Sequence, residues 1–357
     1  MRKVNTADLI PGMVTAENVY NYVNQLILPK GLTLTDKSIT RLEFYSIMSI
    51  RVEDEVTSAP VKQDDSKSYS ERLRETAGFQ NFKNTFDQAV GDFGNVLNGI
   101  ANGSEGVDTD KMWNMFQNIW ESKENNISVF SLLQDMRDND DPTYAHCMNV
   151  ALLTNAFCEW LHYSEEETKL ATTAAMLHDI GKIKISHEII DKPAKLTDEE
   201  YNIIKTHTLE GYNLVKETNL NDHIKNTILM HHERCDGTGY PFGLMGDRID
   251  RFAKLVGIID VYEAMTAKRV YRGPMCPFEV IELYENEGLQ KYDTQYILTF
   301  LENIVYSFIQ HRVRLNNGLE GEIVFVNRTN LSRPTIKSGS TYVDLAMERN
   351  LYIKEII

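Results

Sequence analysis

Histidine is concentrated in one stretch of this chain, and that stretch restricts the folds that the sequence can adopt. Eight of the nine histidines lie between His146 and His232. Several of them fall on the apolar faces of segments with helical periodicity. A polar group buried there without a partner costs about 2–7 kcal/mol. The fold must therefore bring these histidines to partners.

The segment LHDIGKIKI, residues 177–185, shows the problem most clearly, because His178 and Asp179 end an apolar run. Taken alone, Asp179 could cap a turn at Gly181 and His178 could be a hydrogen-bonded core residue. Several further side chains share this inward-facing, apolar setting, and each alone is more often a satisfied core group than a ligand. The full set is His146, His178, Asp179, His207, His231, His232 and Asp260.

Taken together, these residues indicate a metal centre. Five histidines and two carboxylates in one helical region cannot each find a separate neutral partner, whereas metal ions use all of them. Imidazole and carboxylate ligands without thiolate suit iron, manganese, zinc or nickel. Seven ligands exceed the four of one tetrahedral ion, so the sequence predicts two ions. A carboxylate such as Asp179 can bridge two ions about 4 Å apart, a spacing that suits in-line attack on phosphorus.

The order of these residues forms the pattern H…HD-x-x-K…H…HH-E-x-x-DG-x-GYP…D, which includes the run HHERCDGTGYP at residues 231–241. This pattern resembles the HD-GYP family of HD-domain phosphohydrolases, which degrade cyclic di-GMP. The resemblance implies a mainly α fold, an HD-domain helical bundle with small strand-containing modules at both ends. It also implies hydrolysis of cyclic di-GMP to the linear dinucleotide pGpG and, in a further step, to GMP.

The resemblance also implies roles for individual residues. One metal ion would be held by His146, His178, Asp179 and Asp260, and the other by the bridging Asp179 with His207, His231 and His232. The catalytic residues would be His178, Asp179 and Lys182. Substrate would be bound by Lys182, Arg269, Arg272 and Tyr240. Iron or manganese is the metal that the family suggests, with zinc and nickel left open.

Two positions depart from the family pattern. Some members carry a glutamate four residues before the first histidine and bind three metal ions, but Pro142 occupies that position here and cannot be a side-chain ligand. Glu263 stands where the family often has aspartate, which affects the expected rate and substrate preference. Glu233 and Asp236 are expected to orient ligand histidines or the loop. The GTGYP turn either shapes the substrate pocket or contacts a partner signalling domain.

Composition excludes several other classes of protein. The net charge of −15 argues against DNA binding, because neutralising phosphates needs a basic surface, and it leaves an anionic substrate dependent on local cations. The sequence has neither a signal-peptide core nor an apolar run of membrane-span length, so we expect a cytoplasmic protein without a membrane span. The four cysteines have no C-x-x-C spacing, which predicts neither a zinc knuckle nor a disulfide framework.

The chain, at 357 residues, is long enough for several domains. We expect a strand-rich module at 1–58, a helical connector at 59–130, the catalytic domain at 131–305 and a small β module at 306–357. In the last of these, Asn317-Gly318 is a hairpin signal. Apolar residues from Phe79 to Ile100 recur at spacings of three and four. That seam suits either a homodimeric coiled coil or a hairpin with the helix containing MWNMFQNIW.

Three functions fit the sequence. The first is metal-dependent phosphodiester hydrolysis in bacterial second-messenger signalling. The second is a catalytically weak receptor that binds a cyclic dinucleotide and relays its occupancy. The third is hydrolysis of a nucleotide or another cyclic dinucleotide, such as cyclic GMP-AMP. The complete ligand set favours an enzyme over a receptor, and the GYP run favours cyclic di-GMP.

Overall fold

The structure is a computed structural model that describes residues 1–20, 26–34, 38–39, 42, 47–53, 69–124, 127–136, 142–267, 273–339 and 341–357. The chain divides into two compact units, residues 1–67 and 68–357, and each is described separately. Residues 59–68, the start of the expected helical connector, lie outside the described residues.

The first unit contains two small antiparallel sheets. Strand β1 (Arg2–Asn5) pairs with β4 (Ser49–Val52), and β2 (Val19–Tyr20) pairs with β3 (Leu26–Leu28). A 3₁₀ turn, η1 (Thr6–Asp8), follows β1. The sheets share one apolar core, which gives the expected strand-rich module. The buried residues of this core include Leu9, Ile27, Leu28, Leu34, Leu42, Ile50 and Val52.

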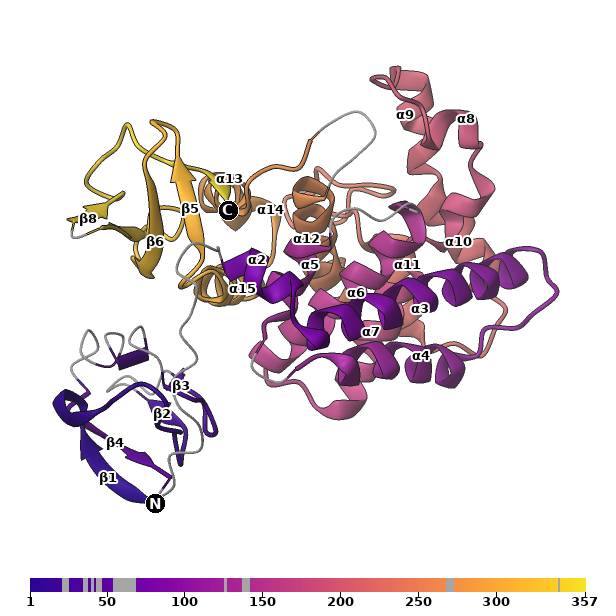
Figure 1. The fold of residues 1–357 in the computed structure, drawn as a ribbon. Coiled ribbons are helices and arrows are strands. Elements are labelled where there is room, and N and C mark those ends of the chain that lie inside the picture. Colours follow the sequence, from indigo (N-terminus) through magenta and orange to yellow (C-terminus); the bar gives the residue numbers. More distant parts are fainter. Residues whose placement is uncertain are drawn as a thin grey trace. The chain divides into compact units, whose positions relative to one another are not determined.

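The second unit is mainly helical, as the sequence predicts (Figure 1). Its first helices are α2 (Tyr69–Arg74), α3 (Ala77–Ala101), α4 (Thr109–Ser122), α5 (Val129–Asp135), α6 (Pro142–Trp160) and α7 (Glu165–Leu177). There follow η2 (Ile180–Lys184), α8 (His187–Ile190), α9 (Asp198–Lys205), α10 (His207–Val215), α11 (Asp222–Met230) and η3 (Gly246–Arg248). The last are α12 (Arg251–Thr266), α13 (Pro277–Leu283), the π-helical turn η4 (Tyr284–Gly288), α14 (Leu289–Lys291) and α15 (Thr294–Ser307).

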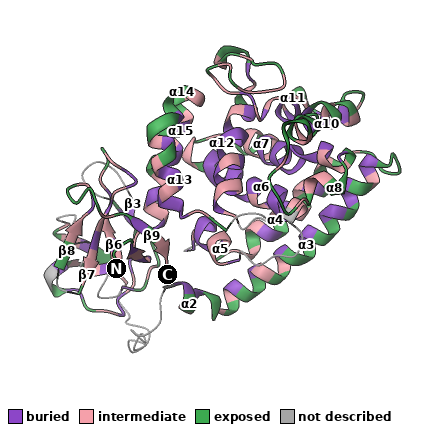
Figure 2. Ribbon diagram, turned by 90° about the horizontal axis from the view of Figure 1, so that it is seen from above, coloured by how far each residue is buried: buried purple, intermediate pink, exposed green. Residues whose placement is uncertain are grey.

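The apolar seam on α3 is buried within the chain. Helix α3 packs against α4 and α6, and the residues expected in the seam, from Phe79 to Ile100, are buried in one continuous core with both helices. Exposed residues alternate with these buried residues along α3 (Figure 2). The contacts therefore match the intramolecular hairpin, and this seam no longer argues for a homodimer.

Helices α6, α7, α11 and α12 form the centre of the bundle, where α7 contacts both α6 and α11 and α12 also contacts both. Helix α12 is buried along most of its length (Figure 2). In contrast, α8 and α9 have no buried residue of their own, and they extend away from the bundle between η2 and α10 (Figure 1). Within the described residues, no helix has the length and apolar character that a membrane crossing requires.

A five-stranded antiparallel sheet follows the helices. Its strand order is β8 (Thr341–Asp344), β7 (Thr335–Ser338), β6 (Glu320–Phe325), β5 (Arg312–Leu315) and β9 (Ile353–Ile356). The expected hairpin at Asn317-Gly318 is confirmed, because it joins β5 to β6.

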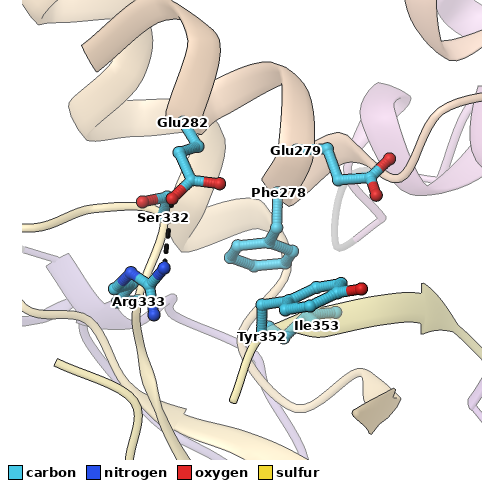
Figure 3. A pocket seen from close by; sticks show the side chains of 7 residues that line it. All are labelled: Phe278, Glu279, Glu282, Ser332, Arg333, Tyr352 and Ile353. Atoms are coloured by element: carbon cyan, nitrogen blue, oxygen red, sulfur yellow. Dashed lines mark hydrogen bonds and ion pairs between the residues drawn. The ribbon is translucent and has the colours of Figure 1, made fainter. Parts of the chain in front are cut away.

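This sheet is fixed to the helices by polar contacts with α13 and η4. Arg333 bridges to Glu282 of α13 at 3.1 Å, beside Phe278 and Tyr352 (Figure 3). Glu285 of η4 accepts a hydrogen bond from the backbone N–H of Ser332 at 3.1 Å. The sheet therefore packs as part of the second unit.

Candidate metal centre

The seven histidines and aspartates singled out in the sequence converge at one place in the second unit. His146 lies on α6, His178 ends α7, and Asp179 follows directly before η2. His207 begins α10, and His231 ends α11. Asp260 lies on α12, which contacts both α11 and α6. Helix ends and short turns thus supply most of the side chains, while α6 and α12 supply one each.

These side chains form two groups, each with ligand atoms within 4.8 Å of one another. One group contains His146, His178 and Asp260, and is called here the carboxylate side. The other contains His207, His231 and His232 together with Asp179, and its three histidines are called the histidine side.

Asp179 lies between the two sides and presents one oxygen to each. Its Oδ2 lies 3.3 Å from Nε2 of His178 and 3.6 Å from Nε2 of His146. Its Oδ1 lies 3.2 Å from Nε2 of His207 and 3.8 Å from Nε2 of His231. This is the arrangement expected of a carboxylate that bridges two metal ions.

Main-chain carbonyl groups orient three of the histidines. The Nδ1–H groups of His178 and His207 donate to the carbonyl oxygens of Ala175 and Ile204, both at 2.7 Å. His231 Nδ1 donates in the same way within its own helix, at 3.1 Å. Because a carbonyl only accepts, each contact places the proton on Nδ1 and leaves the Nε2 lone pair facing the cluster.

A buried carboxylate orients His146 instead. The Nδ1–H of His146 donates to Glu263 Oε2, and its Nε2 lies 3.0 Å from Asp260 Oδ1. Asn149 donates to the second oxygen of Glu263 at 2.9 Å. A carboxylate behind a ligand histidine fixes the ring and raises its basicity, so Glu263 positions His146. Asn149 was not among the predicted site residues, although it lies one turn after His146 on α6, a spacing that brings side chains to one face.

The donor set fits divalent metal ions. His178 Nε2 and Asp179 Oδ1 are buried without a well-aligned hydrogen bond, although His207 lies close to that oxygen. Such orphaned lone pairs are costly in a protein interior and are satisfied by a cation. Imidazole nitrogen and carboxylate oxygen are ligands for the divalent transition metals.

The electrostatics of the cluster favour the same protonation states as metal binding. Burial opposes the charge on Asp179, but the Lys182 ammonium and the His178 ring outweigh it and hold the pKa of that carboxyl well below its usual range. Burial lowers the pKa of His231 to about 3, and the His178 and His207 rings act in the same direction. Asp179 is therefore ionised and His231 neutral, which are the protonation states that metal ligands need.

Cys147 also lies near His178 and Asp179. Burial raises the pKa of the Cys147 thiol well above its usual range. Since a cysteine binds metals as the thiolate, Cys147 is a poor ligand here, which agrees with the expectation of a thiolate-free site.

Two glycines allow the backbone segments to meet around the cluster. A Cβ on Gly181 would lie 1.9 Å from the carbonyl oxygen of His207, so only glycine lets η2 approach α10. A Cβ on Gly257 would lie 2.5 Å from the carbonyl oxygen of His231, where α12 crosses the end of α11. These close approaches explain the glycine of the HDIGK run.

The helix that begins at the capping box of Thr197 and Glu200 is interrupted. The box itself is present, since Thr197 and Glu200 exchange hydrogen bonds at 3.2 and 2.8 Å. The helix stops at Lys205 and restarts at His207, because the side chains of Thr206 and His207 bond to carbonyl oxygens of the previous turn. The break places His207 at the start of α10.

The other residues expected at the site differ in position. Lys182 Nζ lies 2.5 Å from Asp179 Oδ2, and the Tyr240 ring stacks on His232 at 4.7 Å between centroids. Arg269 and Arg272 lie outside the described residues. Glu233 holds the GYP loop rather than a ligand histidine.

The contacts of Glu233 are with backbone groups of that loop. Its carboxylate accepts hydrogen bonds from the N–H groups of Phe242 and Leu244, at 2.7 and 2.8 Å. Asp236 caps the turn by accepting from Thr238. Each such bond to a charged group contributes about 1.5–3 kcal/mol, so these two carboxylates shape the loop next to Tyr240.

A family model described as an HD domain matches residues 131–296. These residues form an HD domain of the HD-GYP family. The HD-GYP domain contains all seven residues of the cluster, together with Lys182 and Tyr240.

Two relatives share this domain. A cyclic di-GMP phosphodiesterase of Pseudomonas aeruginosa is 31% identical over 212 residues, which are 59% of this chain and 50% of that protein. A 3'3'-cGAMP-specific phosphodiesterase of Vibrio cholerae is 34% identical over 145 residues, 41% of this chain and 34% of that protein. The chain thus spans half or less of the length of these relatives.

Among solved structures, a HDG"Y"P protein from Bdellovibrio bacteriovorus is similar to this chain with a TM-score of 0.51. The similarity covers 85% of this chain and 99% of that one, at 18% sequence identity. The similarity in fold therefore extends beyond residues 131–296.

Proposed function

We propose that this protein is a metal-dependent phosphodiesterase that hydrolyses cyclic di-GMP to pGpG, with cleavage to GMP as a further step. The observation that carries the proposal is the position of Asp179, which presents one oxygen to each side of the cluster. Two bridged ions suit hydrolysis of a phosphodiester. The similarity to the Pseudomonas aeruginosa enzyme supports the same substrate.

We assign the ligands as the resemblance to the HD-GYP family implies. His146, His178, Asp179 and Asp260 would hold one divalent ion, and Asp179, His207, His231 and His232 the other. When bound, two such ions polarise a phosphodiester and activate water at neutral pH. Iron or manganese is the proposed metal, because the family suggests these two. Zinc and nickel also bind imidazole and carboxylate ligands.

The remaining roles belong to side chains of the chain itself. Lys182 would contact the phosphate to be cleaved, because its ammonium lies beside Asp179 and its side chain is 24% exposed. Tyr240 would form one wall of the pocket next to His232. Arg269 and Arg272 would add positive charge, an assignment that rests on the sequence alone.

A second substrate is favoured by one observation. The Vibrio cholerae relative is named for 3'3'-cGAMP, which differs from cyclic di-GMP in one base. Glu263 gives no reason to prefer one of these two substrates, because it is buried behind His146, where it contacts His146 and Asn149. No comparable observation favours the receptor.

The arrangement of the whole chain stays a prediction in several respects. We retain the four-part division at residues 58, 130 and 305, the cytoplasmic location, and a partner signalling domain at the GYP loop. A homodimer through residues 79–100 stays untested and has lost the exposed seam that motivated it.

Anaerobic incubation with cyclic di-GMP, with separation of the nucleotides over time, tests the proposal. The protein loaded with manganese or ferrous iron should form pGpG, and a chelator should abolish this. Asp191→Ala, an exposed aspartate between α8 and α9, is the matched control for Asp179→Ala. Unchanged cyclic di-GMP with a fully loaded protein would refute the proposal, and parallel incubation with 3'3'-cGAMP would decide the second substrate.

A further inference from the structure

The metal centre is open to solvent on one side. Most of its side chains are at most 8% exposed, but His232 is 17% exposed and Lys182 is 24% exposed. A substrate must therefore approach past these two residues. Tyr240 stacks on the ring of His232 and so lies at this opening.

Helix α9 brings a lysine and a second tyrosine to the same place. The ammonium of Lys205 lies 5.9 Å from the centroid of the Tyr240 ring and 5.0 Å from that of Tyr201. Both distances are within the range of cation–π contact. His232, Tyr240, Lys205 and Tyr201 thus follow one another outward from the cluster.

The charge of Lys205 is not neutralised by a carboxylate in the described part of the protein. Within that part Lys205 forms no ion pair, whereas the ammonium of Lys182 contacts Asp179. In a protein of net charge −15, a cation at the entrance to the metal centre is an attractive contact for an anionic substrate.

Tyr201 is not explained by packing. It is 49% exposed, and α9 has no buried residue, so this ring does not form part of a core. Exposed aromatic rings beside a cation are the surfaces on which nucleic-acid bases stack, and every base has a face that can use them.

We propose that Tyr201, Lys205 and Tyr240 form a subsite for the half of a cyclic dinucleotide that is not being cleaved. Lys205 binds the second phosphate, and a purine base stacks on Tyr201. This proposal rests on the proposed phosphodiesterase function, and it extends the site to a segment of the HD-GYP domain that supplies no metal ligand.

The test uses the full chain loaded with manganese and a bisphosphorothioate analogue of cyclic di-GMP that is cleaved slowly. Its affinity is measured by titration calorimetry, and KM and kcat are measured with cyclic di-GMP itself. Lys205→Gln and Tyr201→Ala should each weaken binding and raise KM about ten-fold, because each removes a charged or stacking contact. Lys205→Arg and Tyr201→Phe should retain most of the affinity.

Lys195→Gln is the matched control, because Lys195 is exposed on the same segment and lies outside the proposed subsite. Metal content is measured for every variant, so that loss of an ion is not mistaken for loss of a substrate contact. The dependence of binding on salt concentration should become weaker in Lys205→Gln and stay unchanged in the control.

The subsite and the phosphodiesterase proposal fail in different ways. Binding within two-fold of the wild type in both Lys205→Gln and Tyr201→Ala would overturn the subsite, even where cyclic di-GMP is hydrolysed. If the wild type binds the analogue but forms no pGpG, and both variants lose that binding, the subsite is supported and the phosphodiesterase proposal is refuted. A wild type that neither binds nor hydrolyses would refute both.

Discussion

The carboxylate side and the histidine side of the metal centre are held in different ways. On the histidine side, His207 and His231 donate to carbonyl oxygens three or four residues earlier in the chain, those of Ile204 and Thr227. On the carboxylate side, His146 donates to Glu263, which is 117 residues away in the sequence. The histidine side is thus held by local backbone geometry. The carboxylate side combines one such local contact, from His178 to the carbonyl of Ala175, with a contact that needs α6 packed on α12.

This difference has an electrostatic counterpart. Asp260 belongs to the carboxylate side, and Glu263 lies behind it against His146. Burial alone would raise the pKa of Asp260. The hydrogen bond from His146 and the His232 ring outweigh burial and hold that pKa well below its usual range. The histidine side consists of imidazole rings and shares only Asp179. We therefore expect the two metal positions to differ in affinity and in their response to single substitutions, and four predictions test this.

The largest effect is expected for Asp179→Ala, which removes the group common to both sides. Both metal ions should be lost and pGpG formation should fall by more than about 100-fold, because even residues behind the ligands contribute 10–100-fold to affinity or activity. Metal per chain by mass spectrometry and nucleotide chromatography check this. Retained turnover would contradict the bridging role.

A pair of single-side variants should separate the two positions. Asp260→Ala should lower occupancy on the carboxylate side and His207→Ala on the histidine side, each leaving about one ion per chain. Both variants should lose activity by about 100-fold, because in-line displacement uses the two ions together. Equal loss of both ions in both variants would show that the sides fill as one unit.

Glu263→Gln should have a smaller effect confined to one side. It keeps the shape of the side chain but removes the charge behind His146, so affinity on the carboxylate side should fall about ten-fold. The affinity on the histidine side should change less than two-fold. Glu263→Asp should lower the affinity on the carboxylate side by less than Glu263→Gln does, since it retains the carboxylate on a shorter side chain. Competitive metal titrations measure both affinities, and equal losses on both sides would refute this role.

The smallest effect is expected in the pH dependence of the metal-free protein. The pKa of His231 is about 3 in the folded state, below its value of about 6.5 in an unfolded chain. The unfolded state therefore binds more protons between these values, so His231 stabilises the fold fully above pH 6.5 and loses that contribution as pH falls toward 3. The slope should be at most about 1.4 kcal/mol per pH unit, measured by denaturant unfolding. An unchanged slope in His231→Asn would contradict this.

The cluster could be predicted from the sequence because each of its residues has a local signature. His178 and Asp179 end an apolar run, and His207 follows a capping box at a helical spacing. These signals indicate which way a side chain faces. The order of the motifs gave the resemblance to the HD-GYP family, and the resemblance implied the ligand roles. The helical bundle and the hairpin at Asn317-Gly318 followed from periodicity and turn chemistry in the same way.

The contacts that tune the site could not be predicted, because they depend on segments distant in the sequence. The pairing of Glu263 with His146 needs α12 packed on α6, and the position of Lys205 beside Tyr240 needs α9 placed next to the GYP loop. Periodicity did not reveal the break at Thr206, because it comes from side-chain bonds to carbonyl groups that compete with the regular helix.

The close approach of Gly181 to His207 makes the segment between them replaceable. The backbone leaves the bundle after η2 and returns to the same point at α10, and neither α8 nor α9 buries a residue in between. Insertions, deletions or a transplanted loop between Ser186 and Tyr201 would extend into solvent and leave the ligand positions unchanged. A library varied only in this segment would therefore explore which nucleotides are accepted while the hydrolytic chemistry is held constant.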